Sequence, residues 1–209
     1  MSNNIEKVAV LGAGTMGAQI AGHLANAGIP SCLFDISQEL AEKGVGLLKS
    51  LKPAPLYKPK NIELIEACNY DQHLEKIKEV DWILEAVAEN LEIKHKVYNN
   101  IMDYLKDTAI VSSNTSGIPL ADLTKVMSDE VKKRFLITHF FNPPRYMRLL
   151  ELVKGPNTSD DIYNKMASFG ENILGKGIVH GKDTPNFVGN RIGVHGGNNA
   201  VRLAIEMGL

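Results

Sequence analysis

Residues 7–17 read KVAVLGAGTMG, and this stretch decides the fold. The apolar run 7–11 predicts a strand buried on both faces, because its residues do not alternate with polar ones. A G-x-G-x-x-G turn follows, and apolar residues then recur every four positions up to Leu24, as on one face of a helix. Residues 31–35 (SCLFD) read as a second strand. The first 35 residues therefore predict one βαβ unit with a right-handed crossover.

The glycine turn has the features of a dinucleotide-binding site. Gly12 permits the tight turn, Gly14 lets a pyrophosphate approach the backbone, and Gly17 allows the helix to pack closely on the strand. Asp35, at the end of the second strand, is expected to accept hydrogen bonds from a ribose, which favours NAD over NADP. The expected cofactor contacts in the turn are Gly12, Ala13, Gly14, Thr15, Met16 and Gly17. The alternative is a purely structural turn, with Asp35 capping the next helix.

Strands and helices alternate along the rest of the chain. Further strands are expected at 81–87, 109–113, 135–139, 149–153 and 176–180, and helices at 40–51, 91–105, 119–127 and about 162–173. This alternation predicts an α/β fold with a doubly wound, mostly parallel sheet. Residues 184–209 break the rhythm and read as a helix weakened by Gly193, Gly196 and Gly197.

Composition excludes several classes of function. The 209 residues include 23 basic and 24 acidic ones, so no basic surplus is available for nucleic acid, and a small-molecule ligand is expected. Residues 8–34 lack charge, but their glycines and polar residues argue against a membrane span or a signal peptide. Cys32 and Cys68 are too few for a disulfide framework and lack metal-ligand spacing, so no metal and a reducing, cytoplasmic location are expected.

A histidine and a glutamate are the candidate catalytic pair. His139 ends one predicted strand, at the edge where open α/β sheets bind ligands, and Glu151 lies in the middle of the next, LLELV. In one interpretation Glu151 orients the imidazole and His139 acts as a general base on an alcohol. In the other, Glu151 pairs with Arg148 or Arg134, and His139 is a hydrogen-bonded core residue. Pattern and spacing leave both open.

Several motifs in order carry a family resemblance: the glycine turn, SNTS at 113–116, HFFNP at 139–143, Glu151, and KDTPNFVGNR at 182–191. With them, the sequence resembles the NAD-binding part of L-3-hydroxyacyl-CoA dehydrogenase, in particular the bacterial fatty-acid-oxidation type. That resemblance implies NAD-dependent oxidation of an L-3-hydroxyacyl-CoA thioester in β-oxidation. It also implies a fused or associated enoyl-CoA hydratase as a partner, with no nucleic acid or membrane involved.

The resemblance also assigns roles. It implies that His139 is the base and Glu151 its orienting partner, and that Ser116 and Asn190 hold the substrate oxygen. On the cofactor side it implies Glu89, Lys94, Asn142 and again Ser116. Taken alone, Glu89 and Lys94 would read as a solvated helix start with a helical salt-bridge partner.

The resemblance further implies a division of the chain. Residues 1–184 would form the Rossmann-like NAD-binding domain, and 185–209 would be the first helix of a truncated helical domain through which the family forms dimers. We therefore expect this chain to bind NAD and turn over poorly. The segment 144–148 (PRYMR) is bulkier and more basic than in the mitochondrial branch, so acyl-chain preference stays open.

Two rival functions remain from the sequence. The first is a 3-hydroxyacid dehydrogenase of the phosphogluconate type, which uses a catalytic lysine, with Lys176 and Lys182 as candidates. The second is a dinucleotide-binding module without turnover, as in the lens crystallins that resemble this family.

Overall fold

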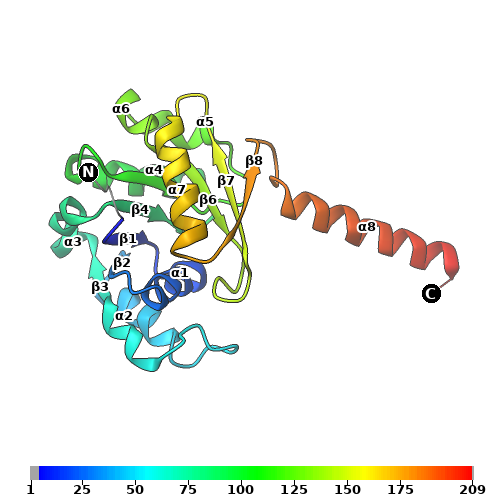
Figure 1. The fold of residues 1–209 in the computed structure, drawn as a ribbon, viewed down its shortest axis with the longest axis horizontal. Helices are drawn as coiled ribbons and strands as arrows, with labels where there is room; N and C mark the ends of the chain where they lie inside the picture. The colour runs from blue at the N-terminus through cyan, green and yellow to red at the C-terminus, as the bar shows by residue number, and fades with distance from the viewer. Residues whose placement is uncertain (1–4, 209) are drawn as a thin grey trace.

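A single eight-stranded sheet organises the computed structural model, which describes residues 5–208 (Figure 1). The strand order is β3-β2-β1-β4-β5-β6-β7-β8; β7 runs antiparallel to β6, and β8 runs parallel to β7. The strands are β1 (Val8–Leu11), β2 (Ser31–Asp35), β3 (Ile65–Asn69), β4 (Trp82–Glu85), β5 (Ile110–Ser113), β6 (Phe135–Phe140), β7 (Leu149–Lys154) and β8 (Gly177–Gly181). The strand order reverses between β1 and β4, which confirms the predicted doubly wound, mostly parallel α/β sheet.

Side-chain caps fix the start of three of the longer helices: Ser37 before α2, Asn90 before α4 and Ser159 before α7 each accept a hydrogen bond from a first-turn backbone N–H. The helices are α1 (Thr15–Asn26), α2 (Gln38–Leu47), α3 (Tyr70–His73), α4 (Leu91–Ile101), α5 (Leu120–Leu123), α6 (Asp129–Lys132), α7 (Asp160–Asn172) and α8 (Gly189–Met207). Short 3₁₀ segments cover Pro59–Leu64, Leu74–Glu79, Met102–Tyr104 and Thr124–Val126.

The sheet is covered on both faces. Val8 and Val10 pack in one apolar cluster with residues of α1 and α7, whereas Ala9 and Leu11 pack in a second cluster with residues of α4. All four side chains of β1 are fully buried, as the unbroken apolar run predicts. The carboxyl ends of the central strands are thereby left as the edge at which side chains can meet a ligand.

Several elements differ from the sequence pattern: the short helices α3 and α6 were not expected, and the helix expected at 40–51 ends at Leu47. The edge strand β3 was not predicted, because its five residues, IEACN, alternate poorly and include the exposed Glu66. The helices expected at 91–105 and 119–127 both end early and continue as 3₁₀ segments. Helix ends often tighten in this way, and the apolar periodicity does not distinguish the two forms.

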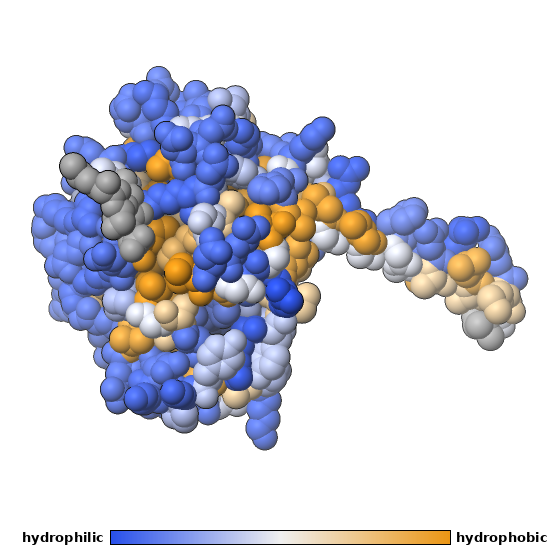
Figure 2. Space-filling model, viewed as in Figure 1, coloured by the Kyte–Doolittle hydropathy of each residue, from blue (hydrophilic) through white to orange (hydrophobic). Residues whose placement is uncertain are grey.

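Helix α8 leaves the body of the molecule and extends away from it (Figure 1). None of its residues is buried, and its exposed apolar side chains are Ile192, Val194, Val201, Leu203, Ile205 and Met207. Apolar surface extends across the body toward the base of this helix (Figure 2). Between residues 5 and 208, no helix is both long and apolar enough to cross a bilayer.

Candidate functional site

The glycine turn is shaped by its lack of side chains. Gly12 has a φ of +107°, and a Cβ there would lie 2.7 Å from the carbonyl oxygen of Ala86. A Cβ on Gly17 would overlap the carbonyl oxygen of Gly12. At Gly14, by contrast, nothing lies within 4 Å of the Cβ position, so a phosphate has room to approach the backbone at the start of α1. Each of the three glycines has the geometry that the motif predicts.

Asp35 lies beside this turn at the end of β2. Its Oδ2 accepts a hydrogen bond from the backbone N–H of Ala13 at 2.8 Å, and Oδ1 accepts one from Ile36 at 2.8 Å. Ser37, not Asp35, caps α2, so the capping alternative is wrong. A cavity of about 280 Å³ opens here. It is lined by Gly12, Gly14, Asp35, Ile36, Tyr70, Ala86, Val87, Ala88, Ile93 and Val97. The carboxylate, the open backbone and the apolar walls fit the adenosine half of a dinucleotide.

The antiparallel register of β6 and β7 sets His139 directly opposite Glu151. The imidazole Nδ1 lies 2.7 Å from Glu151 Oε2, and both side chains are buried. The other carboxylate oxygen, Oε1, accepts hydrogen bonds from the backbone N–H groups of Val188 (3.0 Å) and Gly189 (2.6 Å). The pairing of Glu151 with an arginine is therefore wrong for the described residues; Arg134 donates to the carbonyls of Lys106 and Ala109 instead.

The second imidazole nitrogen faces the loop after β5. Nε2 of His139 lies 3.2 Å from Oγ of Ser116. Ser116 is an exposed residue of the loop after β5. The rings of Phe141 and Phe187 pack on the imidazole, with centroids at 4.5 and 5.6 Å. Because Glu151 accepts the proton on Nδ1, Nε2 carries the lone pair and can accept a proton from a bound alcohol.

The two asparagines lie in different segments, Asn142 between His139 and Glu151 in the sequence and Asn190 after both. Asn142 follows β6, and its Oδ1 accepts a hydrogen bond from Gln19 of α1 at 3.1 Å. Asn190 is in the first turn of α8, next to Gly189, whose N–H is held by Glu151. The structure thus ties both segments to the His139 region, and it adds Gln19, which the sequence patterns did not single out.

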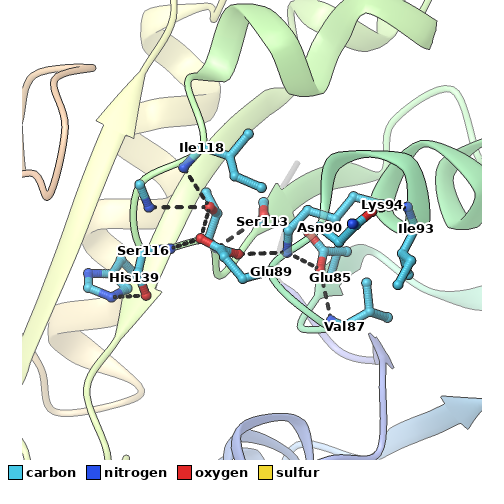
Figure 3. Close-up of polar contacts among 12 residues, drawn as sticks. Glu85, Val87, Glu89, Asn90, Ile93, Lys94, Ser113, Ser116, Ile118 and His139 are labelled. Atoms are coloured by element: carbon cyan, nitrogen blue, oxygen red, sulfur yellow. Dashed lines mark hydrogen bonds and ion pairs between the residues drawn. The ribbon is translucent and has the colours of Figure 1, made fainter.

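A network of charged side chains joins β4 and α4 to the Ser116 loop (Figure 3). Lys94 is only 1% exposed, and its ammonium lies 2.7 Å from Glu85 Oε1 and 3.2 Å from Glu89 Oε2. The pattern of Glu89 and Lys94 suggested a solvated helix start with a salt-bridge partner; the salt bridge is present, but Lys94 is buried and not solvated. Glu85 was missed, although the feature that singled out Glu151, a glutamate within an apolar strand, is also present at residues 82–85 (WILE).

Glu89 connects this network to the loop. Its Oε1 accepts hydrogen bonds from Thr115 Oγ1 at 2.6 Å and from the backbone N–H of Ser116 at 2.8 Å. Burial by itself raises the pKa of Glu89, but these hydrogen bonds and the charge of Lys94 outweigh it and hold the pKa below its ordinary value. Glu89 is thus held as a carboxylate at the edge of the site.

The two lysines considered for the rival reaction, Lys176 and Lys182, differ from each other in burial. Lys176 is buried, and its ammonium donates to the carbonyls of Pro144 and Met147. Burial lowers its pKa to about 8. Lys182 is exposed. Among the described residues, neither lysine forms a hydrogen bond or ion pair with His139 or Glu151, and neither lines the cavity at the glycine turn.

The two cysteines lie closer than their sequence spacing suggested. Pairing of β2 with β3 brings their thiols and the Glu66 carboxylate within 4.8 Å of one another. The expectation that neither cysteine has a partner at metal-ligand distance is therefore corrected. Both thiols are free and buried, and Glu66 is already ion-paired with Lys76.

Comparison with known proteins agrees with this geometry. Residues 7–184 match the family model described as "3-hydroxyacyl-CoA dehydrogenase, NAD binding domain". A Bacillus subtilis protein named "Probable 3-hydroxyacyl-CoA dehydrogenase" is 47% identical over 218 residues, covering 94% of this chain and 28% of that protein. A Deinococcus radiodurans protein of the same name is 43% identical and covers 98% of this chain and 61% of that protein.

Other relatives are longer or structurally known. A Rickettsia prowazekii protein named "Putative fatty acid oxidation complex trifunctional enzyme" is 42% identical, covering 92% of this chain and 28% of that protein. The crystal structure of FadB2 from M. tuberculosis superimposes with a TM-score of 0.86 at 27% identity, covering 98% of this chain and 73% of that one. (S)-3-hydroxybutyryl-CoA dehydrogenase PaaH1 from Ralstonia eutropha gives 0.80 at 33% identity, with 90% and 68% covered. The chain spans 28–61% of the length of these curated relatives.

Proposed function

The chain belongs to the 3-hydroxyacyl-CoA dehydrogenase family, whose NAD binding domain it carries, and we propose that His139 and Glu151 serve the oxidation of an L-3-hydroxyacyl-CoA to the 3-ketoacyl-CoA. One observation carries the proposal. Glu151 holds Nδ1 of His139 at 2.7 Å, which leaves Nε2 within 3.2 Å of Ser116 Oγ. A buried base with its lone pair beside a hydroxyl donor is the arrangement that removal of an alcohol proton requires.

The residues fit the cofactor. The open approach at Gly14, the ribose acceptor Asp35 and the apolar cavity between them would hold the adenosine and pyrophosphate, and Glu89, Lys94 and Asn142 are proposed for the nicotinamide side. NAD, when bound, supplies the hydride acceptor at C4 of its nicotinamide. The remaining steps belong to the chain's own side chains.

Nε2 of His139 would accept the proton of the substrate's 3-hydroxyl group, while the hydride leaves C3 of the substrate for the nicotinamide. The imidazolium that forms is stabilised by the buried Glu151 carboxylate at Nδ1, in a site from which Phe141 and Phe187 help to exclude water. Ser116 Oγ is close enough to His139 to share the substrate oxygen, and Asn190 would contact the same oxygen from the first turn of α8.

The test is His139→Gln in the natural full-length protein. We expect kcat with an L-3-hydroxyacyl-CoA to fall by about 10²–10⁴-fold, because a positioned general base is lost. NADH affinity, measured by fluorescence titration, should stay within about threefold, because His139 does not line the adenosine cavity. Near-normal turnover by this variant would contradict the assignment, and absence of turnover in the wild type would favour a binding module without catalysis.

We further propose the context of the site. The division into residues 1–184 and 185–209, with dimer formation through a helical second domain, is supported by α8, which has no buried residue and whose apolar side chains are exposed. Association with an enoyl-CoA hydratase and a place in fatty-acid β-oxidation are supported by relatives named as fatty acid oxidation complexes. Two free, buried thiols support a reducing compartment such as the cytoplasm.

A further inference from the structure

Glu85 is a buried carboxylate whose every acceptor position is used. It is the last residue of β4, in the middle of the sheet, and is 0% exposed. Its Oε1 accepts from Lys94 Nζ at 2.7 Å and from the backbone N–H of Val87 at 2.8 Å. Its Oε2 accepts from Tyr98 Oη at 2.9 Å and from Ser113 Oγ at 2.6 Å. A buried charge is tolerated only when it is satisfied in this way.

This carboxylate has no direct contact with the proposed reaction. It forms no hydrogen bond with His139 or Glu151, and it does not line the cavity at the glycine turn. Two of its four hydrogen bonds, those from Lys94 and Ser113, instead lead to one place, the loop at residues 115–116 (Figure 3).

The first connection runs through charges. Lys94 bridges Glu85 to Glu89 Oε2 at 3.2 Å. Glu89 Oε1 then accepts from Thr115 Oγ1 at 2.6 Å and from the N–H of Ser116 at 2.8 Å. Because Lys94 is buried between two carboxylates, the charge on Glu85 decides how strongly the ammonium is drawn toward Glu89.

The second connection runs through hydroxyls. Ser113 Oγ donates to Glu85 and accepts from the backbone N–H of Thr115 at 3.1 Å. Thr115 Oγ1 in turn accepts from the N–H groups of Gly117 and Ile118, at 3.3 and 3.0 Å, which closes the turn. The loop that carries Ser116 is therefore held at two points that share Glu85 as their common origin.

We propose that Glu85 is a positioning residue for the dehydrogenase reaction: it fixes the loop at residues 115–118 so that Ser116 Oγ stays within reach of His139 Nε2 and the substrate oxygen. The inference rests on the proposed function. The four donors around Glu85 match a charged acceptor. A glutamine keeps the shape but replaces one oxygen by an NH₂ group, which cannot accept from the two donors on its side, so one of the two connections is broken.

The experiment is a double-mutant cycle between Glu85→Gln and Ser116→Ala in the natural full-length protein. We expect Glu85→Gln to lower kcat by about 10- to 100-fold, since a small misplacement of a positioning group has effects of that size. Because Glu85 acts through Ser116, the double variant should be no slower than Ser116→Ala by more than about twofold. Full additivity, or a normal kcat for Glu85→Gln, would overturn the inference.

Two further variants complete the design. Glu79→Gln removes a carboxylate from an exposed ion pair with Lys7, close to the opposite end of the same strand, and should leave kcat unchanged. If Glu85→Gln does not fold, Thr115→Val takes its place in the cycle. This variant removes the Thr115 hydroxyl that donates to Glu89, which is where the first connection reaches the loop. It should show the same lack of additivity with Ser116→Ala, and additivity would overturn the inference.

A readout without turnover separates this inference from the proposed function. In ¹⁵N-histidine NMR of the chain, the His139 Nε2 resonance should shift in Glu85→Gln in the same direction as in Ser116→Ala, because both weaken the 3.2 Å contact. An unshifted resonance would overturn the inference even in an active enzyme. If the two variants show the shifts but the wild type does not oxidise hydroxyacyl-CoA, the proposed function is disproved instead.

Discussion

The body of the molecule and helix α8 differ in how far their side chains are buried. Every residue of β1, β4, β5 and β6 is buried, and the charged groups at their ends are paired, whereas none of the 19 residues of α8 is buried. The two regions meet at Glu151, which holds His139 with one oxygen and the first backbone N–H groups of α8 with the other.

This difference separates binding from turnover. The cavity at the glycine turn and the His139–Glu151 pair belong to the body, so cofactor binding is expected from the body alone. Asn190 is on α8, whose apolar side chains have no cover among residues 5–208. We expect the chain to bind NAD but to turn over poorly until that helix is packed, because an open site does not exclude water.

The largest effect is expected where the two regions join. Glu151→Gln in the natural full-length protein should lower kcat by about 10²-fold, because the imidazolium loses its carboxylate partner. Amide exchange at Val188 and Gly189 should accelerate in the same variant, since one acceptor serves both N–H groups. Glu171→Gln, on the exposed side of α7, is the matched control. A normal kcat with fast exchange would show that Glu151 anchors α8 and does no more.

Matched glycine substitutions compare the two regions directly. Gly17→Ala should weaken NADH binding by at least about tenfold in a fluorescence titration, because its Cβ overlaps Gly12 and displaces the turn from the pyrophosphate position. Gly193→Ala adds the same methyl group to α8, where nothing lies within 4 Å. It should leave NADH affinity unchanged and favour the helix by about 1 kcal/mol. Equal losses in the two variants would mean that α8 takes part in cofactor binding.

A histidine in each region gives a comparison by pH. Burial, reinforced by the nearby charge of Lys176, lowers the pKa of His23 from 6.5 to about 4. Between these values the unfolded chain binds a proton that the folded chain does not, so stability falls as pH drops from 6.5 toward 4, by up to about 3 kcal/mol. In urea titrations, the free energy of unfolding of His23→Gln should no longer fall in this pH range. That of His195→Gln, on exposed α8, should fall as in the wild type. An unchanged acid sensitivity in His23→Gln would assign it to other groups.

The sequence predicts the features that depend on neighbouring residues and misses those that depend on contacts between distant segments. The glycine turn, Asp35 and the buried strand β1 are local patterns, and the structure confirms their geometry. The His139–Glu151 contact depends on the register of two strands, so spacing alone left it open. The network from Glu85 to Ser116 joins β4, α4 and the loop after β5, and no periodicity in the sequence reveals it.

The smallest effect is expected from removing α8 itself. A chain that ends after Gly189 retains Phe187, which is 2% exposed and packs on His139, and loses only residues that are not buried. Its Tm should change by no more than about 2 °C, and its NADH affinity by less than about threefold, because no core contact is lost. Ending the chain after Asp183 instead removes Phe187 and the N–H partners of Glu151, and should lower the Tm clearly. If both truncations destabilised the protein equally, α8 would be part of the body's folding unit, and the separation of binding from turnover would fail.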